Sequence, residues 1–177
     1  MSAVGYDFTL LDLPADLDEL RRVTYWNSAG EEFKRYLRAV APYSLHSNIA
    51  AAGFCREQMA EFGMLAGGQP RPFPSEPPWD RTMYLSSVEH RRTHPEVWRI
   101  YERAERDASA QRGEGAGIAR FKLESNGPWI VVAEEVEQAL TAYAAVSPSE
   151  RQAVEPDEAW SAWIAWLRRA NLGFEVG

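Results

Sequence analysis

IARFKLESNGPWIVV, residues 118–132, carries the clearest pattern of regular secondary structure in the chain. Two runs that contain aromatic and β-branched residues flank the dipeptide Asn126-Gly127, which supplies the positive φ angles that a tight hairpin turn requires. Pro128 follows directly and cannot donate a hydrogen bond to a neighbouring strand, so it belongs at a strand start or on a sheet edge. The segment therefore predicts a β-hairpin at the edge of a sheet.

Helices and strands are predicted on both sides of this hairpin. Apolar residues at helical spacing predict helices over 16–22, 31–40, 48–62, 95–111, 133–145 and 157–171. Aromatic and β-branched runs predict strands over 6–13, 43–47 and 173–176. A chain of 177 residues has the usual length of one domain. We therefore predict a single α+β domain over 1–177, with a small mixed or antiparallel sheet of about 4–5 strands packed with helices.

Residues 66–79, AGGQPRPFPSEPPW, predict a long surface loop. Proline and glycine are frequent there, and neither sustains the hydrogen bonds of a helix or a strand. Phe73 and Trp79 are large apolar side chains, and we expect them to dock partly against the body of the protein. The helix predicted after the loop has a weak apolar face, formed by Val97, Ile100, Tyr101 and Ala104.

The composition argues against several classes of protein. A net charge of −7 disfavours nucleic-acid binding, which depends on Lys and Arg neutralising phosphates. No apolar run approaches the ~18 residues that a membrane span requires, and the first residues lack the pattern of a signal peptide. The single cysteine, Cys55, excludes an intramolecular disulfide and a multi-cysteine metal site. We expect a cytoplasmic protein without a bound cofactor.

The histidines are the candidate catalytic or metal-binding residues. His90 and His94 are four residues apart, a spacing that on a helix can bring two imidazoles to one metal ion. A zinc hydrolase of this kind needs a glutamate after the first histidine, and that position holds Arg91. Pro95 also disfavours helical geometry at His94. We therefore favour solvated histidines without a metal, and retain His46, His90 and His94 as candidate bases.

Cys55 and the pair Glu134-Glu135 each have a catalytic and a structural interpretation. Cys55 is a candidate nucleophile with His46 as its base, but it also lies on an apolar helix stripe, where free cysteine is usually buried. Glu134 and Glu135 are a candidate acid–base pair, but they also begin a predicted helix, where carboxylates complement the helix dipole. We favour the structural interpretation of each.

Tryptophan recurs along the last predicted helix, at Trp160, Trp163 and Trp166. On an ideal helix the first two share a face and Trp166 points elsewhere, so we expect at least one exposed ring. Packing in the core is the interpretation that we favour for the set. The alternative is an aromatic contact with a partner protein.

One segment near the hairpin resembles a segment known from other proteins; its residues are Lys122, Ser125, Asn126, Trp129, Val131 and Glu134. With its K-x-x-S-N-x-x-W-x-V pattern it is similar to small uncharacterised proteins of high-GC bacteria, which continue into a Trp-rich helix and a final GF-x-V. Pro128 and Ala133 depart from that pattern. The resemblance implies a shared fold for the last third of the chain and carries no activity.

These patterns favour a non-catalytic protein that binds another protein, of the immunity, phage-associated or regulatory kind. Acidic charge, tryptophans and the proline-rich loop suit an interaction surface. The candidate partner-binding residues are Trp166, Trp79, Phe73, Trp129 and Asn126.

Two other functions are consistent with the same sequence. One is a small hydrolase or transferase whose pocket lies between the sheet and the loop over 66–79 and uses His46, His90 or His94 as a base. The other is a homodimer that pairs through the hairpin edge or the tryptophan helix.

Overall fold

The computed structural model describes residues 5–17, 31–75, 90–125 and 127–177. The chain divides into two compact units: residues 1–68 together with 112–177 form the first, and residues 69–111 form the second. A single domain over the whole chain stays a prediction.

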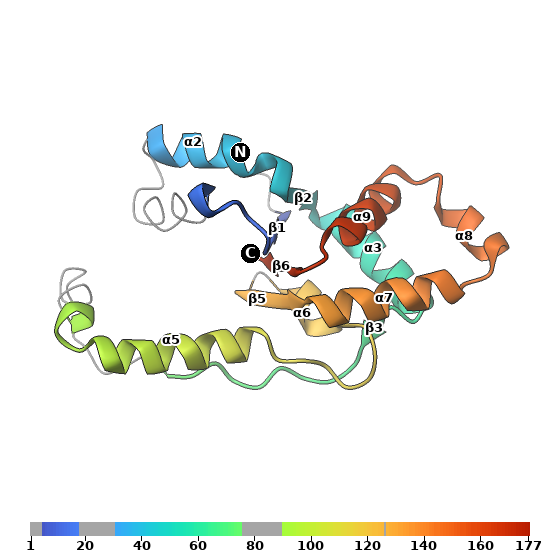
Figure 1. Ribbon diagram of the computed structural model, residues 1–177. Helices are drawn as coiled ribbons and strands as arrows, with labels where there is room; N and C mark the ends of the chain where they lie inside the picture. The colour runs from blue at the N-terminus through green and yellow to red at the C-terminus, as the bar shows by residue number, and fades with distance from the viewer. Residues whose placement is uncertain (1–4, 18–30, 76–89, 126) are drawn as a thin grey trace. The chain divides into compact units, whose positions relative to one another are not determined.

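Within the described residues, four strands of the first unit form one antiparallel sheet (Figure 1). They are β1 (Gly5–Leu10), β2 (Ser44–Asn48), β5 (Trp129–Val132) and β6 (Gly173–Val176). Their order is β2-β1-β6-β5, so the first and last strands of the chain are neighbours at the centre. A separate parallel ladder joins β3 (Leu65–Ala66) to β4 (Ile118–Ala119). The prediction of an α+β fold with a small antiparallel sheet is confirmed.

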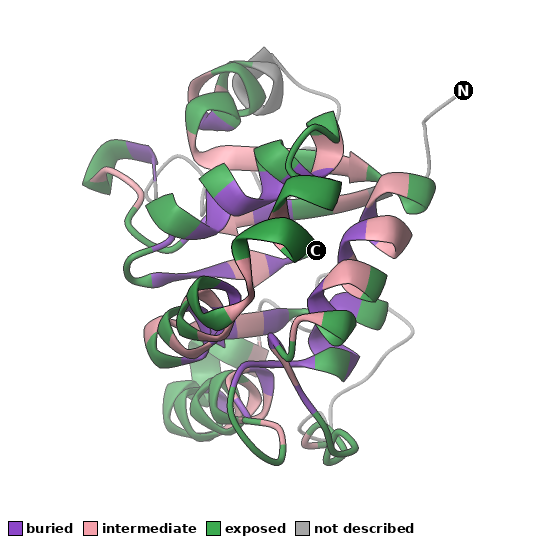
Figure 2. Ribbon diagram, turned by 90° about the vertical axis from the view of Figure 1, so that its right-hand side faces the viewer, coloured by how far each residue is buried: buried purple, intermediate pink, exposed green. Residues whose placement is uncertain are grey.

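Buried residues alternate with less buried ones along strands of the sheet (Figure 2). One face is apolar and buried, with the side chains Phe8, Leu10, Trp129, Val131, Phe174 and Val176. The helices over this face are α3 (Ile49–Glu61), α7 (Ala133–Ala145) and α9 (Glu158–Arg169). Alternate residues point to the opposite face, where Asp7 and His46 are exposed. The core therefore lies between one side of the sheet and these helices.

Several predicted boundaries agree with the structure. The helix predicted over 31–40 is α2 (Glu31–Val40), which leads through the 3-10 turn η1 (Ala41–Tyr43) into β2. Helix α7 and strand β6 have the predicted bounds. Of the helix predicted over 16–22, residues 15–17 are helical and the rest lies outside the described residues. Among the described residues, no helix is both long and apolar enough to cross a membrane.

Side-chain caps set the starts of three helices in the first unit. Asn48 accepts a hydrogen bond from Ala51 N–H at 2.9 Å and begins α3, as predicted. Asp157 accepts a hydrogen bond from the backbone of α9 at 2.9 Å and begins that helix. The sequence prediction missed α8 (Pro148–Val154), although Ser147 and Glu150 form a capping box at its start.

The hairpin predicted over 118–132 is wrong in its first half. Ile118 and Ala119 form the short strand β4, and the chain then turns into α6 (Arg120–Glu124). This helix buries Phe121, Lys122 and Leu123, and Arg120 pairs with Glu124 one turn later at 2.6 Å. Burial of three successive side chains on a helical turn outweighs the strand preference of the isolated run. β5 then begins at Trp129, while Asn126 lies outside the described residues.

The second unit contains α5 (Pro95–Ser109), and its predicted apolar face is wrong. Ile100 is 71% exposed and Val97 is also exposed, whereas Trp98 is buried. The buried ring packs edge-on against Tyr101 at 5.7 Å between centroids, and its Nε1–H donates to His90 Nδ1 at 2.9 Å. One large side chain therefore determines which side of α5 is buried.

The proline-rich segment is held to the end of α5 by one buried glutamine. Gln111 accepts a hydrogen bond from Arg71 N–H at 2.6 Å, and its amide donates to the Arg71 carbonyl at 3.2 Å. Residues 69–75 have no regular helix or strand, as predicted for the loop. Ala66 instead belongs to β3, and residues 76–79 lie outside the described residues.

Candidate functional site

A pocket of about 140 Å³ lies along β2 in the first unit, between α3 and α9. Residues 45–48 of β2 form one wall. The other walls come from Ala51, Ala52 and Cys55 of α3 and from Ala159, Ala162 and Trp163 of α9. Most of these side chains are small or apolar, so the pocket suits an apolar group.

Alanines leave the pocket open between α3 and α9, and aromatic residues form its base. Ala51 of α3 and Ala162 of α9 extend only a methyl group into the gap between the helices. Beneath it, the Trp163 ring packs edge-on against Phe8 at 5.0 Å between centroids. Trp163 Nε1–H also donates to Met59 Sδ at 3.1 Å. The base of the pocket is therefore held by contacts to the sheet and to α3.

The polar groups at the pocket already have partners within the protein. The Arg56 guanidinium donates to the Leu123 carbonyl at 2.7 Å and lies 5.6 Å from the centre of the Tyr6 ring. The Asn48 side chain is occupied as the cap of α3. Shape and apolar surface, more than polar contacts, would therefore select what enters.

Strand β2, beside the pocket, is an edge of the sheet. At the position of His46, its backbone N–H and C=O point away from the sheet. Asp7 donates its N–H to the Gly177 carbonyl at 3.0 Å and accepts from Gly177 N–H at 2.8 Å, so its peptide groups face β6. Asp7 pairs with His46 in the register of β1 and β2. The N–H and C=O of His46 therefore point away from β1. Among the described residues no strand pairs with this side of β2.

The His46 side chain lies on the opposite face of the sheet from the core. Its Nδ1 is 2.8 Å from Asp7 Oδ1, and the two side chains are 54% and 68% exposed. Cys55 instead faces the buried core. The proposed dyad of Cys55 and His46 therefore does not form.

Burial raises the pKa of the Cys55 thiol from 9.0 to about 12, with a smaller contribution from the charge of Asp157. The thiolate fraction at neutral pH is then about a thousandfold lower than for an exposed cysteine. We expect native Cys55 to react with iodoacetamide at pH 8 at least about a hundredfold more slowly than in 6 M guanidinium chloride. Mass spectrometry of timed samples measures both rates, and equal rates would contradict the burial of this thiol.

His90 and His94 lie together in the second unit and contact each other. Their rings stack with centroids 4.4 Å apart, while His90 Nδ1 accepts from Trp98 and His94 Nδ1 lies 2.8 Å from Thr93 Oγ1. His94 has non-helical backbone angles as the N-cap of α5, in agreement with the effect expected of Pro95. Within the residues that the structure describes, no three His, Cys, Asp or Glu side chains form a metal-binding group.

The packing in the core that we favoured for the tryptophans of the last helix is confirmed, and the expectation of at least one exposed ring is wrong. Trp160, Trp163 and Trp166 are all buried, with 0%, 5% and 3% exposure. Trp166 packs against Phe174 of β6 at 6.4 Å between ring centroids. The third ring reaches the core because α9 packs on the sheet and also contacts α3 and α7, so more than one side of it is covered.

The other candidate partner-binding residues have different positions. Trp129 is also buried, since it faces the core from β5 and donates its Nε1–H to Ser125 Oγ at 2.8 Å. Phe73 is exposed at 36%, and Trp79 and Asn126 lie outside the described residues. Neither Trp166 nor Trp129 therefore presents its ring on the surface of the first unit.

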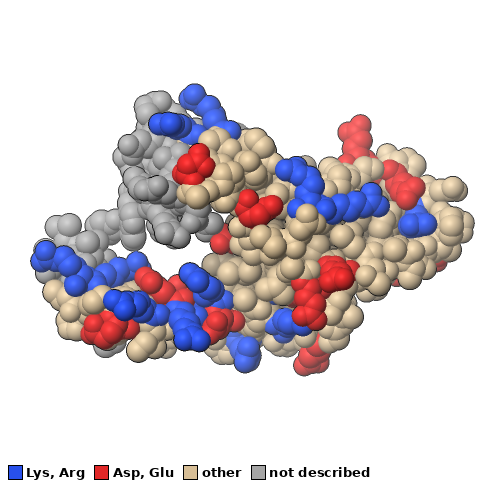
Figure 3. Space-filling view, viewed as in Figure 1, with Lys and Arg blue, Asp and Glu red and all other residues tan. Residues whose placement is uncertain are grey.

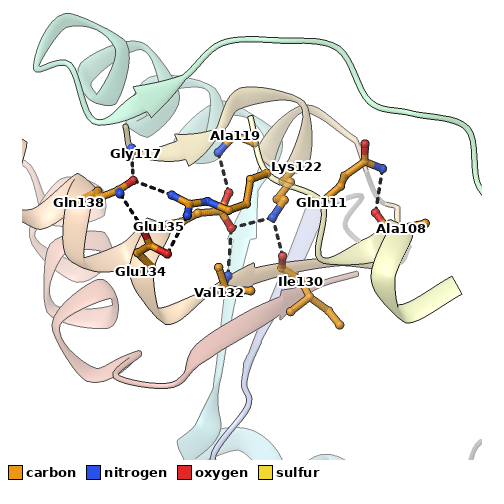
Figure 4. Close-up of polar contacts among 11 residues, drawn as sticks. Ala108, Gln111, Gly117, Ala119, Lys122, Ile130, Val132, Glu134, Glu135 and Gln138 are labelled. Atoms are coloured by element: carbon orange, nitrogen blue, oxygen red, sulfur yellow. Dashed lines mark hydrogen bonds and ion pairs between the residues drawn. The ribbon is translucent and has the colours of Figure 1, made fainter. Parts of the chain in front are cut away.

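A buried ion pair closes the other edge of the sheet (Figure 4). Lys122 of α6 and Glu135 of α7 are both fully buried, and Lys122 Nζ lies 2.7 Å from Glu135 Oε2. Lys122 also donates to the Ile130 carbonyl at 2.7 Å, and Glu135 accepts from Val132 N–H at 3.0 Å. Both backbone groups belong to β5, on the side away from β6. The pair therefore takes the place of a further strand.

The same network fixes the start of α7. Glu135 also accepts a hydrogen bond from Ala119 N–H at 3.2 Å, so its carboxylate joins β4, β5 and α7. Burial lowers the pKa of Lys122, and the neighbouring Glu135 carboxylate opposes that effect. Exposed Glu134 binds Arg112 at 2.7 Å instead. The adjacent glutamates thus have the structural role at the start of a helix that the sequence favoured, and Glu135 fills it from a fully buried position.

No protein-family model, curated protein or solved structure matches this chain. The pocket and the strand edge beside it are therefore interpreted from their own geometry.

Among the residues that line the pocket, sequence patterns indicated His46 and Cys55 as a candidate dyad, but they did not indicate the pocket itself. Leu45, Ala51 and Ala162 carry no reactive group, and their importance depends on which strand and helices become neighbours. The one available indication is the spacing of alanine in two predicted helices, at Ala51 and Ala52 and again at Ala159 and Ala162. Small residues at such spacing can leave a pocket between two helices, but they also allow the helices to pack closely. This pattern alone therefore predicts neither a pocket nor a close helix contact.

Proposed function

We propose that the protein binds another protein without catalysis, and that the pocket along β2 receives one apolar side chain of that partner. The observation that carries the proposal is an apolar pocket of about 140 Å³ beside an open strand edge. An engineered cavity of about 150 Å³ lined by apolar side chains holds one benzene molecule. The pocket therefore has room for one side chain of the size of leucine or phenylalanine.

Burial of one such side chain would supply much of the binding energy. Moving a leucine or phenylalanine from water into an apolar site contributes roughly 1.5–3 kcal/mol. Interfaces commonly concentrate their energy in a few residues that occupy well-packed pockets, aromatic residues prominent among them. The proposal includes immunity-type, phage-associated and regulatory proteins that bind their partner in this way.

The chemistry of the pocket favours binding over the hydrolase or transferase alternative. The Cys55 thiol stays protonated because its pKa is raised to about 12. The His46 imidazole lies on the exposed face of the sheet with Asp7, not beside the thiol. The groups that line the pocket therefore do not combine into a nucleophile and its base.

Charge does not define a competing site on the face that Figure 3 shows. Asp and Glu side chains are scattered there with Lys and Arg between them, as on an ordinary solvated surface. The acidic excess of the sequence is therefore a weaker guide to the partner than the pocket.

A selection from displayed random peptides tests the proposal. We expect wild-type protein to enrich peptides that share an apolar residue, and Ala162→Phe, which fills the pocket, to weaken them by at least about tenfold. Ala165→Phe is the matched control, because both alanines are exposed on the same helix and Ala165 does not line the pocket. Circular dichroism shows whether each variant folds.

The selection tests both the contact site and the proposed function. Equal binding by wild type and by folded Ala162→Phe would overturn the pocket as the contact site. Failure to enrich any peptide would overturn the proposed function.

A further inference from the structure

We infer that the partner contributes an extended segment, which pairs antiparallel with β2 as a further strand of the sheet. This inference rests on the proposed function and names the kind of partner. Extended peptides that add to a sheet edge gain affinity from main-chain hydrogen bonds and specificity from pockets for alternate side chains. The first unit offers both features at the same strand.

The backbone of β2 determines where the added strand pairs. The N–H and C=O of His46 point outward, because its partner in β1, Asp7, directs its own peptide groups to Gly177. The outward N–H of Ser44, in contrast, is used by the Ala41 carbonyl. His46 is therefore the position at which an incoming residue would exchange two hydrogen bonds with β2.

The pleat of the sheet then assigns the side chains of the incoming segment. The residue opposite His46 has its side chain on the exposed face, beside the imidazole. The neighbouring residues lie opposite Leu45 and Ser47, whose side chains point to the core face and line the pocket. The apolar side chain that enters the pocket must therefore be next to the residue opposite His46.

A hydroxyl residue fits the position opposite His46. Nδ1 of the imidazole is occupied by Asp7 at 2.8 Å, which leaves Nε2 for the incoming strand. A serine or threonine hydroxyl both donates and accepts, so it can pair with Nε2 in either protonation state of the ring. The segment is thus expected to alternate, with Ser or Thr opposite His46 and Phe, Leu or Met adjacent.

A second copy of this chain fits the position less well than another protein. Antiparallel pairing of two β2 strands about His46 would place Leu45 and Ser47 next to the central residue. Leu45 is packed against the core of its own molecule, and Ser47 is too small to fill the pocket. The opposite edge of the sheet is less open, because Lys122 occupies the outward carbonyl of Ile130 and Glu135 occupies the outward N–H of Val132. We therefore assign β2 to a segment of another protein.

Hydrogen exchange at the His46 amide, followed by NMR, tests strand addition with a peptide from the selection above. We expect the peptide to slow exchange at His46 by at least about tenfold. Two N-methylated versions provide a matched pair. Methylation at the residue opposite His46 removes an N–H that pairs with β2, so it should weaken binding about tenfold. The residue whose side chain enters the pocket has its N–H directed away from β2, so methylation there should have little effect.

The outcomes separate this inference from the proposed function. One outcome is that Ala162→Phe weakens peptide binding, while both methylated peptides bind equally and exchange at the His46 amide is unchanged. Strand addition is then wrong, and the pocket remains the contact site. A His46 amide that is already protected in the free monomer means that the chain covers its own edge, and this also overturns the inference. Dimers in sedimentation that protect His46 would identify a second copy as the occupant instead. If no peptide is enriched, both proposals fail together.

Discussion

Replacing Lys122 by methionine is expected to lower the free energy of unfolding by about 3–5 kcal/mol, the usual result of removing one partner from a buried ion pair. Glu135 would remain fully buried, with its carboxylate facing two backbone N–H groups but no cation. The Ile130 carbonyl would also lose its donor. For a chain of this size, such a loss lowers the melting temperature by roughly 6–20 °C.

Arg120→Met is the matched control for this prediction. Arg120 lies on the same helix and pairs with Glu124 at 2.6 Å, but its side chain is 60% exposed, so solvent screens the interaction. We expect little change in its melting temperature. Urea titrations followed by circular dichroism compare the two variants, and similar midpoints for both would contradict the role assigned to the buried pair.

Trp166→Ala is expected to destabilise the protein by about 3–5 kcal/mol, the range for truncating a buried aromatic side chain to alanine. The ring is 3% exposed and packs against Phe174 in the core. Any loss of partner binding in this variant would therefore follow from unfolding. A urea titration measures the change, and a loss below about 1 kcal/mol would show that the ring is not in the core.

Trp166→Phe is expected to have a much smaller effect than Trp166→Ala. No described residue accepts a hydrogen bond from the buried Trp166 Nε1, so phenylalanine removes an unpaired donor while it keeps an aromatic ring. Trp160→Phe provides the comparison, because Trp160 Nε1 donates to the Tyr143 hydroxyl at 3.4 Å. We expect Trp160→Phe to be the more destabilising of the two, and the reverse order would contradict the assignment of partners.

Much of the first unit could be predicted because its elements are specified locally. The Asn48 side chain caps α3 wherever that helix packs, and Gly63, with φ of 66°, ends it in a conformation that other residues rarely adopt. Alternation along β6 likewise indicates one buried face. Such features depend on the chemistry of neighbouring residues in sequence, which a single chain displays.

The errors arose where long-range contacts outweigh local preference. The run that begins at Ile118 contains residues common in strands, but Lys122 is drawn to Glu135, which lies 13 positions later. Only a helical turn at α6 places Phe121, Lys122 and Leu123 together in the core. The pocket was unpredictable for the same reason, since Leu45 and Ala162 become its walls only through the packing of β2 and α9.

The difference between the two edges of the sheet limits how this protein can aggregate. Filaments built by edge-to-edge strand pairing need two competent ends on every molecule, so that each addition leaves a new end for the next. Here the outward Ile130 carbonyl and Val132 N–H of β5 are already bonded to Lys122 and Glu135, and among the described residues no such side-chain pair blocks the edge at β2. Association through β2 would therefore stop after one step, as chain growth stops when a monomer has a single reactive end.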